Sequence, residues 1–301
     1  MTAPATVHGG FETQEMNEVL RRACAAAGLD STDAKILRGH TNAVVLLAHD
    51  PVVVKIARRG SSQASVQRTV RFVSWLMELG FPTVPLHPVP QQPTVIDGHP
   101  VTFWTYLPQP QHPVAAELIA PPLRALHQLP EPPEPLRELD NAAAIKASIN
   151  ATTSLPAATL DFLTRRLATL EARLADVAFA LPRAVVQGDP QHRNALHHEG
   201  RAVLCDWDTV AQGQPEWDLV TIEIHCRRFG YGQEHYDAFA DSYGFDVTTW
   251  EGYPTLRDLR ELRMITTNAR KAAQAPGTLA EVERRITGLQ REDADLRWKI
   301  L

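Results

Sequence analysis

The chain has 301 residues, of which 44% are hydrophobic and 22% charged, and its formal net charge is −5 at pH 7. This length and apolar fraction suffice for one large or two small domains with a real core. The acidic balance argues against a nucleic-acid partner, and the lack of any apolar run of ~20 residues argues against a membrane span. Three widely spaced cysteines and an N-terminus without a secretory pattern favour a cytoplasmic protein with reduced thiols.

The first part of the chain predicts one helix followed by a β-hairpin. Residues 13–27 have the spacing of an amphipathic helix, and Gly28 is suited to end it. Residues 44–47 and 52–56 are apolar, β-branched runs separated by a His-Asp-Pro turn. This pattern is typical of two paired strands.

Lys55 lies inside the second of these runs, in the sequence VVVKIA. A lysine within an apolar strand is costly unless its ammonium group meets an anion. Two interpretations follow: an ammonium that binds an anionic group, or a lysine at a strand edge that reaches water. The flanking apolar residues favour the first.

A second hairpin and a series of helices are predicted for the rest of the chain. Residues 94–96 and 101–104 flank Asp97-Gly98, a strong hairpin turn. The residue pattern predicts helices over 64–79, 115–129 and 156–178, two helices within 219–243, and closing helices over 256–273 and 278–300. Residues 141–150 are either a short alanine-rich helix or an irregular segment. The two closing helices carry many charges, which predicts that their faces are largely exposed.

The most informative stretch is 185–208, VVQGDPQHRNALHHEGRAVLCDWD. An apolar run at Val185 breaks at Gly188. Ala195 and Leu196 then precede a polar turn over 197–201, and a second apolar run, 202–205, ends on Asp206. We expect a hairpin-like pair of short strands bounded by turn residues, with Asp189, Asn194 and Asp206 together at its open end. Oxygen ligands suit Mg²⁺, and a further carboxylate can accept a proton from an attacking hydroxyl. Such groups are the core of a phosphoryl-transfer site.

The segments QGDPQHRN and CDWD resemble the signature of the aminoglycoside phosphotransferase family, relatives of the protein kinases. The resemblance implies an α+β, bilobal protein-kinase-like fold, with a nucleotide-binding lobe of small antiparallel sheet over 1–104 and a mostly helical catalytic and substrate-binding lobe over 105–301. It also implies a Mg²⁺-dependent transfer of the γ-phosphate of ATP or GTP to a hydroxyl of a small molecule, either an aminoglycoside or another hydroxylated metabolite or antibiotic.

The same resemblance assigns roles to individual residues. Asp189 would be the catalytic base, and Asn194 and Asp206 would bind Mg²⁺. Lys55 would hold the α- and β-phosphates of the nucleotide. The loop over the phosphates would contribute Arg38, His40, Thr41 and Asn42, and the adenine would meet the backbone of Thr105, Tyr106 and Leu107. Acidic contacts to an amine-bearing acceptor would come from Asp208, Glu223, Asp237 and Asp241.

Three departures from the family pattern motivate a second hypothesis. Gln187 stands where the family has His, Thr69 stands where a helix Glu pairs with the strand lysine, and the loop 38–42 is poor in glycine. The alternative is a nucleotide-binding pseudoenzyme that acts as an interaction or regulatory module. The segment GQPEWDL also fits the family, and it predicts that Asp218 braces the loop that carries Asp189. The acceptor, the choice between ATP and GTP, and the oligomeric state stay open.

Overall fold

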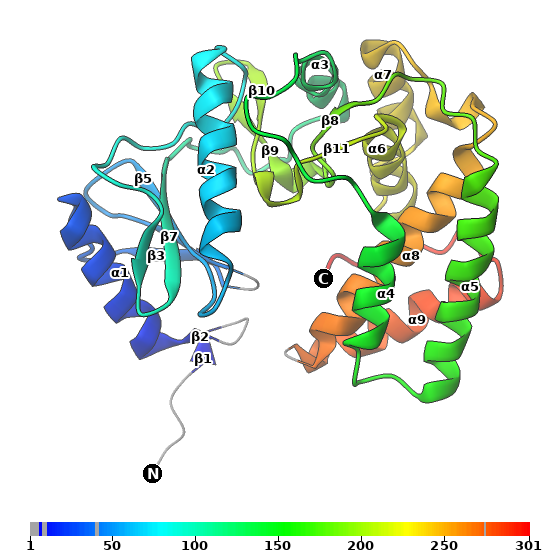
Figure 1. The fold of residues 1–301 in the computed structure, drawn as a ribbon, viewed down its shortest axis with the longest axis horizontal. Coiled ribbons are helices and arrows are strands. Elements are labelled where there is room, and N and C mark those ends of the chain that lie inside the picture. The colour runs from blue at the N-terminus through cyan, green and yellow to red at the C-terminus, as the bar shows by residue number, and fades with distance from the viewer. Residues whose placement is uncertain (1–5, 8–10, 40–41, 274) are drawn as a thin grey trace. The chain divides into compact units, whose positions relative to one another are not determined.

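The computed structural model describes residues 6–7, 11–39, 42–273 and 275–301 (Figure 1). The chain forms two compact units. The first, here the N-unit, comprises Met1–His112 and Leu196–Asp208. The second, the C-unit, comprises Pro113–Ala195 and Thr209–Leu301.

The N-unit contains a five-stranded antiparallel sheet in the order β3-β4-β5-β7-β6. Its strands are β3 Lys35–Arg38, β4 Ala43–Leu46, β5 Val52–Ile56, β6 Thr94–Ile96 and β7 His99–Thr105. The predicted hairpins are present. Asp97 and Gly98 both have positive φ, 49° and 82°, as a tight turn between twisted strands requires. A minor pair, β1 Thr6–Val7 and β2 Phe11–Glu12, precedes the sheet.

Two helices accompany this sheet, α1 Thr13–Ala27 and α2 Gln63–Glu78, and Figure 1 shows the strands between them. The predicted apolar face of α1 is confirmed, since Met16 and Leu20 belong to a buried cluster with Val54 and Phe103. Burying a side chain of this size is worth about 1.5–3 kcal/mol. This shared core fixes β5, and with it the position of Lys55.

The hairpin predicted within 185–208 is present. Its strands are β9 Ala195–His198 and β10 Arg201–Leu204, which pair across the predicted polar turn. Gly200, with φ 76°, lies in this tight turn. The run at Val185 is β8 Ala184–Val186, and its pairing with β11 Ala211–Gly213 was not predicted.

The C-unit is mostly helical. Its helices are α3 Ala116–His127, α4 Asn141–Asn150, α5 Ala157–Ala175, α6 Glu216–Arg228, α7 Gln233–Tyr243, α8 Tyr253–Ala272 and α9 Leu279–Gln290. Nearly all of α6 is buried, and α8 contacts α4, α5, α6 and α9. Among the described helices, none combines the length and apolarity that a membrane span requires.

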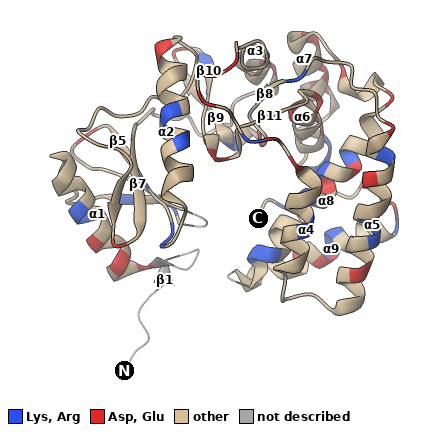
Figure 2. Cartoon of the chain, viewed as in Figure 1, with Lys and Arg blue, Asp and Glu red and all other residues tan. Residues whose placement is uncertain are grey.

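The expectation that α8 and α9 present largely exposed charged faces is wrong. Both helices carry basic and acidic residues (Figure 2), but several of these are buried. Glu261 of α8 is only 2% exposed and accepts hydrogen bonds from Arg227 and Arg228. Arg285 of α9 is 1% exposed and pairs with Glu281. Buried charges are tolerated when they are paired in this way, and a count of charges along a helix does not reveal such pairs.

Candidate active site

Lys55 holds two carboxylates within the N-unit. Its side chain leaves the face of β5 opposite to the buried Val54 and Ile56, and its Nζ donates to Asp206 Oδ1 at 2.9 Å and to Asp208 Oδ2 at 2.8 Å. Burial opposes the charged form, but the two carboxylates raise the pKa of Lys55 above its ordinary value. The ammonium group is therefore charged at neutral pH. Asn42 also donates to Asp208 Oδ2, at 3.4 Å.

Trp207 positions these two carboxylates. Its ring is buried against Phe72 and Phe81, and its Nε1 donates to Thr83 Oγ1 at 2.9 Å. Asp206, on one side of this anchor, has φ 58°, a left-handed conformation that Asp tolerates better than most residues. The aspartates on either side of the tryptophan are thereby directed to Lys55.

Thr69 stands in α2 at the position where the family pattern has a glutamate. It donates its hydroxyl to the Ser65 carbonyl at 3.3 Å, and the hydrogen-bond partners of the Lys55 ammonium among the described residues are Asp206 and Asp208. The strand lysine thus has anionic partners without a glutamate on the helix.

The other residues predicted for the nucleotide also belong to the N-unit. Arg38 is exposed at the end of β3, and His40 and Thr41 lie outside the described residues. The Thr105 N–H donates to the Pro85 carbonyl and the Tyr106 N–H to the Pro51 carbonyl. These two N–H groups already have acceptors, so a nucleotide base bound beside this segment would contact its other backbone groups, such as those of Leu107.

In the C-unit, Asp218 locks the turn that follows β8. Its carboxylate accepts the Gln187 N–H at 2.7 Å and the Gly188 N–H at 2.8 Å, which is the bracing role predicted for it. His127 contacts the same carboxylate at 3.0 Å. Gly188 has φ 83°, and a Cβ there would lie 2.6 Å from the Thr209 carbonyl oxygen. Only glycine fits this position without movement of the backbone.

Gln187 has a defined function in the same turn. Its side chain is fully buried, and its Oε1 accepts the Asp189 N–H at 2.6 Å. The Thr209 hydroxyl donates to the Gln187 carbonyl at 2.8 Å. The glutamine therefore supports the loop through its own amide, although the family pattern has histidine at this position.

The carboxylate of Asp189 projects from this turn and is held at both oxygens. Gln191 Nε2 donates to Oδ2 at 2.8 Å, and Arg260 Nη2 donates to Oδ1. Asn194, in the one-turn helix His192–Asn194, donates its Nδ2 to the Asp189 carbonyl at 2.8 Å. Its remaining amide oxygen is the kind of ligand that Mg²⁺ takes. Asp206 of the N-unit, the second predicted ligand, offers a carboxylate oxygen, so each residue by itself is of a type that a hard cation binds.

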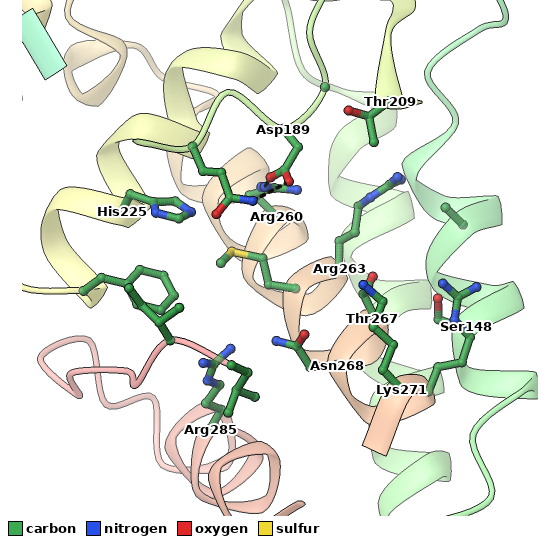
Figure 3. Close-up of a pocket in the computed structure, with 18 of the residues that line it drawn as sticks. Ser148, Asp189, Thr209, His225, Arg260, Arg263, Thr267, Asn268, Lys271 and Arg285 are labelled. Atoms are coloured by element: carbon green, nitrogen blue, oxygen red, sulfur yellow. Dashed lines mark hydrogen bonds and ion pairs between the residues drawn. The ribbon is translucent and has the colours of Figure 1, made fainter. Parts of the chain in front are cut away.

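A cavity of about 480 Å³ opens beside Asp189 within the C-unit (Figure 3). Asp189 and Arg260 point toward each other at its wall, and Arg263, Lys271 and Arg285 line the same space. This volume is typical of a small-molecule site. A hydroxyl bound in the cavity would have a fixed carboxylate as neighbour.

The acidic residues predicted for the acceptor lie elsewhere. Asp208 pairs with Lys55 in the N-unit. Glu223 is buried and pairs with Arg227 at 2.7 Å, and Asp237 accepts from Gln233 at 2.8 Å. Among the described residues that line the cavity there is no Glu223, Asp237 or Asp241.

Sequence reasoning missed the arginines of α8. Arg260, Arg263, Arg270 and Lys271 recur at spacings that place them on one side of a helix. No acidic residue falls at the same spacings, so the pattern differs from the mixed charges of a solvated helix. That signal was present in the sequence.

The described residues contain one histidine and cysteine cluster, formed by His192, Cys226 and His235. The two histidines already contact each other through their Nε2 atoms at 3.0 Å, and the Ala116 N–H donates to His235 Nε2. Burial lowers the pKa of His192 to about 3. Tyr231 stacks on the His192 ring at 3.9 Å. These contacts are those of a packed, neutral cluster.

Comparison with known families decides the class. The sequence model of the phosphotransferase enzyme family matches residues 33–259, three quarters of the chain. The chain belongs to this family. The matched range includes Lys55, Asp189 and Asp206 and ends one residue before Arg260. No curated protein sequence is significantly similar to this phosphotransferase.

Solved structures share its fold at low identity. The choline kinase LicA from Streptococcus pneumoniae is 18% identical, with 92% of this chain and 99% of that chain covered and a TM-score of 0.69. Amicoumacin kinase hAmiN, in complex with AMP-PNP, Ca²⁺ and Ami, is 14% identical, with 96% of each chain covered and a TM-score of 0.71. An aminoglycoside-3'-phosphotransferase of type VIII is 18% identical, with 82% of this chain and 98% of that chain covered and a TM-score of 0.59. The predicted α+β protein-kinase-like fold of the phosphotransferase is confirmed.

Proposed function

We propose that this phosphotransferase moves the γ-phosphate of a nucleoside triphosphate, ATP or GTP, to a hydroxyl group of a small molecule. The observation that supports it best is the fixed carboxylate of Asp189 at the wall of the C-unit cavity. Positioning and electrostatics supply most of the rate in such reactions, so a carboxylate held at both oxygens is well suited to the task.

Asp189 is the proposed base. The hydroxyl oxygen of the acceptor forms a bond to the γ-phosphorus as the bond from that phosphorus to the β–γ bridging oxygen breaks. The electron pair of that bond leaves with the nucleoside diphosphate, and the hydroxyl proton passes to the Asp189 carboxylate. Gln191 and Arg260 keep the carboxylate oriented toward the acceptor, so that little reorganisation is needed during the reaction.

The nucleotide is assigned to the N-unit residues. Lys55, directed by its pairs with Asp206 and Asp208, would contact the α- and β-phosphates. Arg38, His40, Thr41 and Asn42 would cover the phosphates, and the segment Thr105 to Leu107 would contact the base. The division into a nucleotide-binding lobe over 1–104 and a catalytic and substrate-binding lobe over 105–301 stays a prediction, and the N-unit also includes residues 105–112 and 196–208.

Asn194 and Asp206 are the residues proposed to hold Mg²⁺. When bound, the ion would neutralise charge on the phosphate oxygens. The role of the chain is to present an amide oxygen and a carboxylate for it. Asn194 is oriented by its bond to the Asp189 carbonyl, and Asp206 by the Trp207 anchor and Lys55.

The pseudoenzyme alternative has less support. Gln187 holds the Asp189 N–H through its own amide, and Lys55 has two carboxylate partners despite Thr69. Two of the three departures that motivated this alternative therefore have substitutes in the structure. A binding module would also have no need for an oriented carboxylate in a cavity.

A screen of acceptors tests the proposal. Nucleotide consumption would be measured with Mg-ATP and Mg-GTP over a library of hydroxylated sugars, acids, amino alcohols, nucleosides and aminoglycosides, with mass detection of an added phosphate. The Asp189→Asn protein is the matched control. We expect an acceptor-dependent mass increase of one phosphate with the unaltered protein alone. Binding of nucleotide without transfer to any acceptor would favour the pseudoenzyme.

A further inference from the structure

The wall of the C-unit cavity is strongly basic. Its side chains include five basic groups and a single carboxylate, that of Asp189, among the described residues. The basic residues are Arg260, Arg263, Arg270, Lys271 and Arg285. Figure 3 shows Arg263, Lys271 and Arg285 around the space below Asp189. His225 also lines the cavity. Burial lowers its pKa to about 3, so its ring is neutral at pH 7.

Aromatic rings hold these guanidinium groups in place. Arg260 and Arg263 lie over the Trp217 ring, 5.2 and 5.8 Å from its centroid. Arg285 lies over Trp298 at 4.5 Å. Ring faces attract cations without neutralising them. The arginines are thus fixed within the C-unit. Arg260 also pairs with Asp189 and Arg285 with Glu281, whereas Arg263 has no carboxylate partner among the described residues.

Two of these arginines retain unused donors. Arg260 is 5% exposed and Arg285 is 1% exposed, yet Arg260 Nε and Arg285 Nη1 are buried without a hydrogen-bond partner among the described residues. Buried donors are satisfied in more than about nine of ten cases. Among the described residues, the hydrogen-bond acceptor of Arg263 is a neutral group, the Asn141 amide oxygen, at 2.8 Å. Burial and the neighbouring Arg260 lower the pKa of Arg263 to about 10.

We propose that the acceptor carries an anionic group, a carboxylate or a phosphate, in addition to the hydroxyl that is phosphorylated. This inference rests on the proposed function and specifies its substrate class. The planar guanidinium fork matches both anions through two parallel hydrogen bonds. The anion would meet Arg263, Arg285 and Lys271, with the hydroxyl directed to Asp189. A polycationic aminoglycoside would meet like charges at the same wall.

The family comparison does not assign this cluster. The matched range ends at residue 259, whereas the basic residues of the cavity begin at Arg260. Phe229 and Met264 add apolar surface beside the arginines. The cavity thus suits a compact, partly apolar acid rather than an extended, highly hydrated cation.

Binding of a matched set of four sugars tests the inference without requiring phosphoryl transfer. The set is glucuronate, glucose 6-phosphate, glucose and glucosamine, measured by calorimetry with the full chain. We expect at least one of the two anionic sugars to bind about tenfold or more tightly than glucose and glucosamine, the effect of one charge-assisted hydrogen bond. Preference for glucuronate alone or for glucose 6-phosphate alone would identify the anion as carboxylate or phosphate.

Variants locate the effect in the cavity. Arg263→Gln keeps a polar side chain beside Asn141, and Lys271→Gln keeps a polar side chain at an exposed position of α8. Each should remove most of the anion preference, whereas Arg173→Gln, on the exposed surface of α5, should leave it unchanged. Circular dichroism checks that each variant is folded.

The outcomes separate this inference from the proposed function. Equal affinities across the four sugars, no binding by any of them, or a preference for glucosamine would overturn the anionic acceptor and leave the kinase proposal standing. Phosphoryl transfer that is fastest to polycationic acceptors, and unchanged in Arg263→Gln, would overturn it as well. Absence of transfer to any acceptor would instead count against the kinase proposal, while the binding preference would still be measurable.

Discussion

Arg260 donates through Nη2 to Oδ1 of Asp189, so the residue proposed as the catalytic base is held by a residue that also forms the wall of the cavity. The guanidinium group is nearly fully buried and lies over Trp217. It cannot move without disturbing that packing. The orientation of the Asp189 carboxylate therefore depends on the packing of α6, which carries Trp217, against α8, which carries Arg260.

Replacement of Arg260 is predicted to reduce turnover more than nucleotide affinity. Arg260→Gln removes the cation but leaves a polar group near Asp189, and we expect kcat to fall about 10- to 100-fold with the KM for nucleotide within about twofold. Arg260→Lys should recover part of the loss, because an ammonium still donates one hydrogen bond. Equal kcat values for Arg260→Gln and the unaltered protein would rule out a positioning role.

Gly188→Ala is predicted to damage the loop that carries Asp189. The new Cβ would lie 2.6 Å from the Thr209 carbonyl oxygen at a positive φ, so we expect a loss of about 1–3 kcal/mol in the free energy of unfolding and loss of activity. Gly200→Ala is the matched control, because Gly200 has φ 76° but no neighbour within 4 Å of a Cβ. Urea unfolding of both variants gives the comparison, and an equal effect would contradict a steric role of Thr209.

The aspartates beside Trp207 are predicted to differ in importance. Asp206→Ala should weaken Mg-nucleotide binding about tenfold or more, since it removes a proposed metal ligand and a partner of Lys55. Asp208→Ala removes the second partner of Lys55 and the acceptor of the Asn42 hydrogen bond but no proposed metal ligand, so its effect should be smaller. Both carboxylates are partly exposed, and stability should change by less than about 1 kcal/mol. Titration calorimetry with Mg-ATP measures the affinities, and unchanged binding in Asp206→Ala would exclude the metal assignment.

The buried histidines predict a loss of stability in mild acid. Burial lowers the pKa values of His192 and His225 to about 3, below the ordinary value near 6.5 of the unfolded chain. Their contribution to stability is complete above pH ~6.5 and is lost as the pH falls toward 3, since only the unfolded state takes up protons in this window. His225→Gln should lessen this pH dependence by up to about 1.4 kcal/mol per pH unit.

Urea unfolding at pH 7 and at pH 5 measures this dependence. His198→Gln serves as the control because His198 is exposed. A pH dependence that is the same in His225→Gln and in the unaltered protein would contradict the account of a buried neutral ring.

The sequence predicts most of the helices because apolar periodicity is a local property. The helix at 13–27 coincides with α1, and of the two possibilities for 141–150 the helix is present, as α4. Strand partners depend on residues far along the chain, and for this reason the pairing of β8 with β11 was missed. The segments that contain Asp189, Asn194 and Asp206 resemble the signature of the phosphotransferase family, and the family match confirms the class that this resemblance implied.

The basic cavity was not predicted, for a different physical reason. The sequence places the basic residues of α8 on one side of the helix, but it does not show that this side is enclosed by other elements. Arg260 and Arg263 are buried because Trp217, on another helix, offers its ring to both. Such a contact leaves no trace in the local sequence.

The central claim is that Asp189 takes the proton of the acceptor hydroxyl, and Asp189→Asn tests it most directly. The measurement is the rate of phosphate transfer from Mg-nucleotide to the acceptor found in the screen, together with the nucleotide affinity by calorimetry. The account predicts that transfer falls by about 10²- to 10⁴-fold while nucleotide affinity stays within about twofold. Transfer at the normal rate by Asp189→Asn would contradict it.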